Sequence, residues 1–285
     1  MNTPPRKVNR VPFAEPGALL TRHHKAALIA PELAALGLTL TATDAFDTDQ
    51  LGTFSGEIAR TLSPLDCART KAKLACQLTG CSWGIGSEGS FGGGPFPGML
   101  PWNEELLLLY DQLTGQEIVA RVGMAVALTS IETQDWELVR QHLAKHDPKQ
   151  GWMLRGPDGW HKELQGEHAV LTALQSAGLL GPNLSLRQQI TLQPDLRAHV
   201  CPPRQAVIQQ AAAQLAQRLT AHCPHCSAPD FWVNDCVRGL PCGDCGFLTS
   251  QISSTIKRCS RCGHQEQQPV ATAWADAKHC PSCNP

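Results

Sequence analysis

Eight cysteines near the end of the chain form four Cys-x-x-Cys pairs. Two residues between thiols let both sulfurs of a tight turn face one metal ion, and four thiolates complete a tetrahedral zinc site. Fifteen residues separate the first two pairs and seventeen the last two, within the usual spacing of zinc-binding pairs. The sequence therefore predicts two structural zinc ions. The expected ligands are Cys223, Cys226, Cys242, Cys245, Cys259, Cys262, Cys280 and Cys283.

The residues around these pairs favour zinc knuckles over redox dithiols. Gly246 and Gly263 directly follow the second cysteine of a pair, where a knuckle turns back and φ becomes positive. A single pair would leave a disulfide framework open, but four in tandem favour zinc. Cys236 lies between pairs, and we interpret it as a buried thiol or as a group that contacts the ligands. Neighbouring histidines could replace a thiolate: His222, His225, His264 and His279.

Two arrangements of the cysteine pairs are open, consecutive and interleaved. We expect the consecutive one, because gaps of fifteen and seventeen residues each close a loop of hairpin size. An interleaved arrangement would need longer crossing connections.

The chain is long enough for one substantial domain ahead of the cysteines. It has 285 residues, of which 42% are hydrophobic, enough for a packed core. Segments with the patterns of strands and helices alternate through residue 192, which predicts an α/β domain. We expect a flexible leader over 1–16, the α/β domain over 17–202, a connecting helix over 203–222 and two zinc ribbons over 223–285.

Composition narrows the choice of partner and compartment. A formal net charge of −1 gives no global field that would attract nucleic acid or an anionic membrane. No apolar run approaches the length of a membrane span, and the first residues lack the apolar core of a secretory signal. Thirteen cysteines without such a signal indicate a reducing compartment. We expect a cytoplasmic protein with no membrane partner.

Four charged residues lie where the predicted elements of the α/β domain begin or end. Lys25 stands between a strand and a helix, where cations and free amides could hold phosphate. Asp66 and Lys71 lie on a helix whose start is marked by Ser63 as N-cap and a proline after it. Glu88 ends a strand between glycines, where backbone can approach a ligand closely. Cations facing carboxylates would suit a magnesium–polyphosphate substrate.

Other segments complete the expected α/β domain. Two apolar strands over 105–111 and 117–127 are joined near a Thr-Gly turn, which predicts a hairpin. A long polar loop over 44–57 contains the segment GTFSGE, and loops of this length are often functional. Glu57 is therefore a further candidate.

The order of these motifs resembles that of the inosine/xanthosine triphosphate pyrophosphatase superfamily. The matching segments are Thr21 with Lys25, then Asp66-Cys67-Ala68-Arg69-Thr70-Lys71-Ala72, then Gly86-Ser87-Glu88-Gly89-Ser90, and later Arg197-Ala198-His199 with Arg204. The resemblance implies that Asp66 and Glu88 bind Mg²⁺ and activate water, and that Lys25 and Lys71 hold phosphates. It also implies that His199 and Arg204 contact the base or the tail of a nucleotide. Over its whole length, the chain resembles a bacterial family of unassigned activity that shares GTFSGE, SEGSFG, GWMLR and the cysteine pairs.

The sequence is compatible with two alternative functions. The first is a magnesium-dependent hydrolase of a nucleotide or another phosphorylated small molecule. The alternative is a non-catalytic module in which the ribbons bind nucleic acid or protein on an α/β scaffold. The ribbons carry basic residues among aromatic ones, a mix compatible with nucleic acid, but interspersed acids favour a packing surface.

Overall fold

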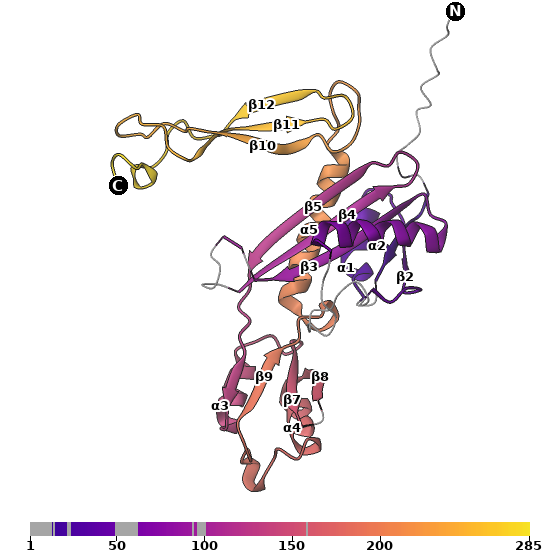
Figure 1. Cartoon of the computed structure of the whole chain (residues 1–285), viewed down its shortest axis with the longest axis vertical. Coiled ribbons are helices and arrows are strands. Elements are labelled where there is room, and N and C mark those ends of the chain that lie inside the picture. Colours follow the sequence, from indigo (N-terminus) through magenta and orange to yellow (C-terminus); the bar gives the residue numbers. More distant parts are fainter. Residues whose placement is uncertain are drawn as a thin grey trace, which may run out of the picture. The chain divides into compact units, whose positions relative to one another are not determined.

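The computed structural model describes residues 13, 15–21, 24–48, 62–92, 94, 95, 101–157 and 159–285. The chain divides into two compact units, Met1–Leu215 and Ala216–Pro285. The described residues form five α-helices and three β-sheets (Figure 1). The segment GTFSGE with Glu57 lies outside the described residues. Among the helices that are described, none is long and apolar enough to cross a membrane.

A five-stranded sheet in the first unit has the strand order β2-β1-β3-β4-β5 (Figure 1). β1 pairs in parallel with β2 and β3, whereas β3, β4 and β5 are antiparallel neighbours. The hairpin expected from the sequence is the β4–β5 pair. The strands are β1 (Gly17–Leu20), β2 (Leu40–Thr43), β3 (Trp83–Phe91), β4 (Trp102–Asp111) and β5 (Glu117–Ala125).

The direction of chain progression reverses at β1. After β1 the chain forms helix α1 (Ala26–Ala34) and pairs β2 on one side of β1. It then forms helix α2 (Pro64–Thr79) and returns as β3 on the other side. All four residues of β1 are buried, as expected for a strand with parallel neighbours on both sides. Such a reversal is the usual ligand-binding position of an α/β sheet.

Helix α2 begins and ends where the sequence predicts. The Ser63 side chain accepts from the Asp66 amide at 3.1 Å, and Gly80 ends the helix with a φ of +75°. α2 packs directly on β3, because a Cβ at Gly86 would lie 1.7 Å from the Ala68 carbonyl oxygen. The sequence interpretation placed a ligand against the glycines of this strand. At Gly84 and Gly86 the backbone of α2 fills that space instead.

A second, smaller sheet in the first unit has the order β6-β9-β7-β8 and is antiparallel throughout. Its core buries Trp136, Trp152 and Leu154 together with aliphatic side chains from two helices that pack on it, α3 and α4, whose bounds are given below. The sequence did not predict β6 or β8, because both are short or largely polar. The elements are β6 (Ile131–Thr133), α3 (Trp136–Ala144), β7 (Gly151–Gly156), β8 (Gly159–Gln165), α4 (Gly166–Ser176), β9 (Ile190–Pro194) and short 3-10 turns at Pro182–Leu184 and Ala198–Val200.

The last helix and the last sheet follow. Helix α5 (Pro202–Thr220) agrees closely with the expected connecting helix. The second unit contains an antiparallel sheet of three strands, β10 (Trp232–Arg238), β11 (Ile252–Arg258) and β12 (Gln265–Pro269). A 3-10 turn at Ala277–His279 precedes the last cysteine pair.

Candidate functional site

The eight predicted cysteines form two groups of four in the second unit. In the first group, Cys223 and Cys262 have sulfurs 3.7 Å apart, and the Cys226 and Cys259 sulfurs are 3.6 Å apart. A tetrahedral site with zinc–sulfur bonds of about 2.3 Å has sulfur–sulfur edges of about 3.8 Å. The residues therefore fit zinc without rearrangement. The corresponding distances in the second group are 3.9 Å for Cys242–Cys283 and 3.6 Å for Cys245–Cys280.

The consecutive pairing expected from the sequence is wrong, because the first pair joins the third and the second joins the fourth. β10 lies between the first and second pairs and β11 between the second and third, and each strand has seven residues. Seven extended residues span roughly 20 Å, far more than one metal ion can bridge. Since the strands are antiparallel neighbours, alternate pairs return to the same end of the sheet.

All four cysteine knuckles are closed by the same backbone hydrogen bond. In each, the carbonyl of the first cysteine accepts from the amide four residues later. Gly246 and Gly263 have φ values of +74° and +76°, which confirms the left-handed turn predicted for both glycines. The donors and acceptors are Ser227 to Cys223 at 2.8 Å, Gly246 to Cys242 at 2.9 Å, Gly263 to Cys259 at 3.0 Å and Asn284 to Cys280 at 2.8 Å.

The residues suggested as replacement or supporting ligands belong to neither four-cysteine group. His264 stacks with His225 and Phe231 at ring-centroid distances of 5.9 and 5.6 Å. Its Nε2 lies 3.3 Å from Glu266 Oε1. Cys236 is only partly buried within β10, between the two ends of the sheet, so its interpretation as a buried thiol is wrong.

A buried group of charged side chains lies in the first unit. Lys25 Nζ donates to Ser87 Oγ at 3.0 Å and lies 3.9 Å from Glu105 Oε2. Arg204 Nε donates to Glu105 Oε1 at 2.7 Å, and Asn103 Nδ2 donates to the same oxygen at 3.1 Å. All five residues are more than nine-tenths buried.

Three further residues meet on the α2 face of β3. Lys71 forms an ion pair with Glu88, and Cys67 Sγ donates to Glu88 Oε1 at 3.0 Å. Cys67 and Lys71 lie four residues apart on α2, so they project from the same face of the helix. We call the eight residues of both groups the charge cluster: Lys25, Cys67, Lys71, Ser87, Glu88, Asn103, Glu105 and Arg204.

The charge cluster lies where β1 ends. By the register of the parallel pair, Leu20 is level with Gly86, so Ser87 and Glu88 continue past the last residue of β1. Lys25 lies in the turn that leads from β1 into α1. The cluster is therefore at the reversal of strand order, where α/β sheets bind ligands.

Burial and neighbouring charges set the protonation of two cluster residues. Burial, reinforced by the Arg204 charge, lowers the pKa of Lys25 to about 8, although Glu105 and Glu88 oppose this shift. Burial alone would raise the pKa of Glu88, but the charges of Lys71 and Lys25 outweigh it, and the pKa lies below its ordinary value. Glu88 is therefore an ionised carboxylate at neutral pH.

Asp66 lies apart from the charge cluster, at the exposed start of α2. It accepts from Ser63 Oγ at 2.6 Å and forms an ion pair with Arg69. The hydrogen bond from Ser63 and the charge of Arg69 lower the pKa of this carboxyl group. The structure thus brings together Lys25, Lys71 and Glu88 of the expected site, but not Asp66.

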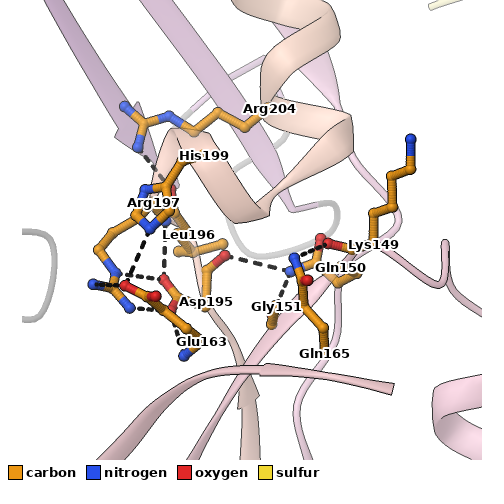
Figure 2. A network of polar contacts seen from close by, with 10 residues as sticks. All are labelled: Lys149, Gln150, Gly151, Glu163, Gln165, Asp195, Leu196, Arg197, His199 and Arg204. Atoms are coloured by element: carbon orange, nitrogen blue, oxygen red, sulfur yellow. Dashed lines mark hydrogen bonds and ion pairs between the residues drawn. The ribbon is translucent and has the colours of Figure 1, made fainter. Parts of the chain in front are cut away.

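His199 belongs to a second polar network, in which its side chain, Arg197 and Glu163 point toward one another (Figure 2). His199 Nε2 lies 3.1 Å and Arg197 Nη1 2.9 Å from Glu163 Oε1. Arg197 Nε also donates at 3.0 Å to Asp195, whose carboxylate is buried. The network holds His199 in place through charged hydrogen bonds.

Arg204 connects this network to the charge cluster. Its Nη1 donates to the Leu196 carbonyl at 2.6 Å, next to Arg197 (Figure 2). Its Nε donates to Glu105. The His199 ring also lies 6.3 Å from the ring of His24, the residue before Lys25. His199 is therefore a neighbour of the cluster rather than a member of it.

A pocket of about 530 Å³ lies at the carboxyl ends of β1 and β2. Its lining includes hydroxyl groups, an imidazole and a carboxylate. Lys25 follows directly after one lining residue, but its side chain turns inward to Ser87. The lining residues are Thr21, His24, Ala26, Ala27, Ala42, Thr43 and Asp44.

Sequence reasoning missed Asn103, Glu105 and the contact of Arg204 with them. Asn103 and Glu105 occupy alternate positions of β4, so both project from the same face of the sheet. Two polar residues at this spacing, ahead of four consecutive leucines, were a signal of a buried polar site. Nothing in the sequence showed that Arg204 pairs with Glu105, because 99 residues separate them.

Comparison with models of protein families gives a match. A family model described as "Domain of unknown function (DUF6671)" matches residues 71–285. The chain belongs to this family. The match includes Lys71, Glu88, Glu105, Arg204 and all eight clustered cysteines, whereas Lys25 precedes it. Searches of curated proteins and of solved structures found no match, so neither supports the resemblance to the pyrophosphatase superfamily.

Proposed function

We propose that the first unit hydrolyses a phosphorylated small molecule at the charge cluster, with nucleotides as the first class to test. The observation that carries this proposal is the gathering of charged side chains at the reversal of strand order. Lys71 pairs with Glu88 on the α2 face of β3, and Lys25 and Arg204 pair with Glu105 on the opposite face. Among the described residues, three basic side chains and two carboxylates lie at this position. Basic side chains at the carboxyl end of a sheet favour an anionic ligand.

The roles of the residues follow from their contacts. Lys71 and Arg204 would neutralise phosphate oxygens and the charge that develops during transfer. Glu88, ionised at neutral pH, would accept a hydrogen bond from the attacking water and orient it. Asp66, held by Ser63 and Arg69, is assigned to capping of α2 rather than to catalysis.

The charge cluster does not fit a magnesium site as the sequence suggested. Glu88 is paired with Lys71 and accepts from Cys67, and Glu105 is paired with Arg204 and accepts from Asn103. Magnesium needs carboxylate oxygens that are free to enter its octahedral shell. The proposal therefore relies on the basic side chains.

Phosphate or pyrophosphate release from canonical and deaminated nucleoside triphosphates, with and without Mg²⁺, tests the proposed activity. We expect Lys71→Ala to lower turnover by about 100-fold, as removal of a transition-state donor does. Glu104→Gln is the matched control, because Glu104 precedes Glu105 in β4 and pairs with Arg121 outside the cluster. If no compound releases phosphate or pyrophosphate, or if Lys71→Ala and the control have equal rates, the proposed hydrolase activity is refuted.

We infer a structural role for zinc in the second unit. Each cysteine group has the geometry of a four-thiolate site, and so small a unit gains most of its folding free energy from metal. Thiolates that keep zinc need a reducing compartment, and we propose the cytoplasm. Chelation should therefore unfold the second unit first.

A second candidate function is protein binding by the second unit. Phe247, Leu248 and Trp274 are 51%, 65% and 62% exposed and lie beside the knuckles of the second cysteine group. The unit has six Lys or Arg and five Asp or Glu, a balance that favours a protein partner over nucleic acid. A salt-sensitive gel shift on RNA or DNA, weakened by Arg258→Ala and Arg261→Ala, would instead favour nucleic acid.

A further inference from the structure

Ser87 and Lys25 form a buried hydroxyl–amine pair inside the charge cluster. Lys25 Nζ lies 3.0 Å from Ser87 Oγ, and the residues are 7% and 4% exposed. A serine hydroxyl in contact with an amine can lose its proton to that amine when the amine is neutral. The question is which charge Lys25 carries.

The contacts around Lys25 make its proton easier to lose than that of an exposed lysine. Glu105 lies 3.9 Å from Lys25 and accepts from Arg204 at 2.7 Å. In the described part of the chain, both cations thus pair with this carboxylate, and Arg204 makes the shorter contact. Lys71 adds a further positive charge, and Glu88, which is paired with Lys71, opposes it only in part.

The pKa of Lys25 agrees with this geometry. Burial and the Arg204 charge lower it to about 8, so that a substantial fraction of the amine is neutral near that pH. Arginine cannot lose its proton in this range, so the lysine is the group that does.

Arg204 lies on the same face of β3 as Ser87. A Cβ at Gly89 would lie 2.5 Å from Arg204 Nη2, and residues 87 and 89 project from the same side of the strand. The guanidinium is therefore one pleat away from the Ser87 hydroxyl. It could stabilise negative charge on a group bound to Ser87.

We propose that Ser87 is the nucleophile and Lys25 its general base, so that the phosphoryl group passes through a phosphoserine at Ser87. This proposal rests on the proposed hydrolase and names its intermediate. In the first half, Ser87 Oγ bonds to phosphorus while its proton moves to neutral Lys25 Nζ. The bond from phosphorus to the leaving oxygen breaks, and that oxygen takes the proton from Lys25.

The second half returns the enzyme to its starting state. Water attacks the phosphorus and gives a proton to Lys25, which is neutral again. The bond between phosphorus and Ser87 Oγ breaks, and Oγ takes that proton. Phosphate leaves, and no oxidant or reductant is required.

Labelling of the full chain with diisopropyl fluorophosphate tests the pair without knowledge of the substrate. The intact mass should show one adduct, and peptide mapping should place it on Ser87. The rate of labelling should rise with pH with a midpoint near 8, because the reactive form contains neutral Lys25. The adduct should be absent in Ser87→Ala and at least about 10-fold slower to form in Lys25→Met.

Ser90→Ala is the matched control and should label like the parent chain, since Ser90 lies in the same strand outside the cluster. No adduct on Ser87 in the folded parent chain, or labelling independent of pH, would overturn the proposal without any variant. Turnover of a phosphorylated compound that persists in Ser87→Ala would refute the intermediate and leave the hydrolase standing. A Ser87 adduct without turnover of any phosphorylated compound would refute the hydrolase and leave the reactive pair.

Discussion

At the scale of single residues, each buried charge of the first unit is stabilised by its oppositely charged partner. Lys71 and Glu88 have side chains only 12% and 5% exposed, so neither can be fully solvated if the other is removed. A buried ion pair adds little net stability over an apolar pair, but breaking one leaves an uncompensated charge. The cluster is thus costly to disturb whether or not it is catalytic.

Lys71→Met should destabilise the first unit by about 3 kcal/mol, because the buried Glu88 loses its ion pair with Lys71. The double variant Lys71→Met/Glu88→Gln should recover much of that loss. Urea denaturation followed by tryptophan fluorescence measures both. Lys73→Met is the control, since Lys73 is exposed and lies over the Tyr110 ring at 5.1 Å, a contact of at most about 1 kcal/mol. Equal losses in Lys71→Met and Lys73→Met would contradict the ion pair.

The depressed pKa of Lys25 predicts a pH-dependent stability. Between about pH 8 and the ordinary lysine pKa of 10.5, the unfolded chain keeps the Lys25 proton while the folded chain has lost it. The unfolded state then binds more protons, so the free energy of unfolding rises with pH in this window. At 1.36 kcal/mol per pKa unit, the parent chain should gain up to about 3 kcal/mol relative to Lys25→Met.

Denaturation of the parent chain and of Lys25→Met at pH 7.5 and pH 10 measures this gain. The difference between the two chains cancels the titration of all other groups. Below pH 8 the difference between the chains should be constant, because Lys25 is protonated in both states. A difference that stays flat up to pH 10 would show that Lys25 is not desolvated.

At the scale of elements, close contact between α2 and β3 brings Cys67 and Lys71 to Glu88. Gly86→Ala should destabilise the first unit by about 3 kcal/mol, because its Cβ would meet the Ala68 carbonyl oxygen of the helix backbone. Gly123→Ala is the comparison, since its Cβ would meet the Trp102 indole at 2.5 Å, and a side chain can move. Thermal unfolding should rank Gly86→Ala as the more damaging. The reverse order would show that α2 can shift away from β3.

Local signals predicted most elements of the first unit. Ser63 and Gly80 bound α2 as their capping chemistry requires, and apolar periodicity gave the β4–β5 hairpin. β8 was missed because a largely exposed strand has no strong alternation. The place where Lys25, Lys71 and Glu88 meet was predictable only as an order of motifs, since their contacts depend on strand pairing between distant segments. The order of motifs did not predict that Asp66 lies apart from the cluster, because the direction of a helical side chain depends on its position in the helix.

In the second unit, too, local signals predicted the turns but not which cysteine pairs come together. Knuckle geometry follows from residues next to each cysteine, so the turns at Gly246 and Gly263 were predicted. The pairing follows from which segments become strands, and β10 to β12 are polar and short. Loop length alone favoured the wrong arrangement.

For the whole molecule, metal content distinguishes the two arrangements. The parent chain should bind about two zinc ions, one for each group of four thiolates. Cys226→Ser/Cys259→Ser removes two ligands of one group and should leave about one zinc ion. Cys226→Ser/Cys242→Ser removes one ligand from each group and should weaken both sites. Consecutive pairing requires the opposite pattern, and elemental analysis of the purified chains decides between them.

Turnover by Glu88→Gln and Asp66→Asn, compared with that of the parent chain, tests whether Glu88 acts on the substrate. Glu88 lies in the cluster beyond the end of β1, whereas Asp66 only holds the Ser63 cap of α2. Phosphate release should fall about 100-fold or more in Glu88→Gln, because the amide cannot orient water as the carboxylate does. It should stay within a few-fold of the parent rate in Asp66→Asn, since the asparagine carbonyl can still accept from Ser63 Oγ. Full activity in Glu88→Gln, or a larger loss in Asp66→Asn, would contradict the account.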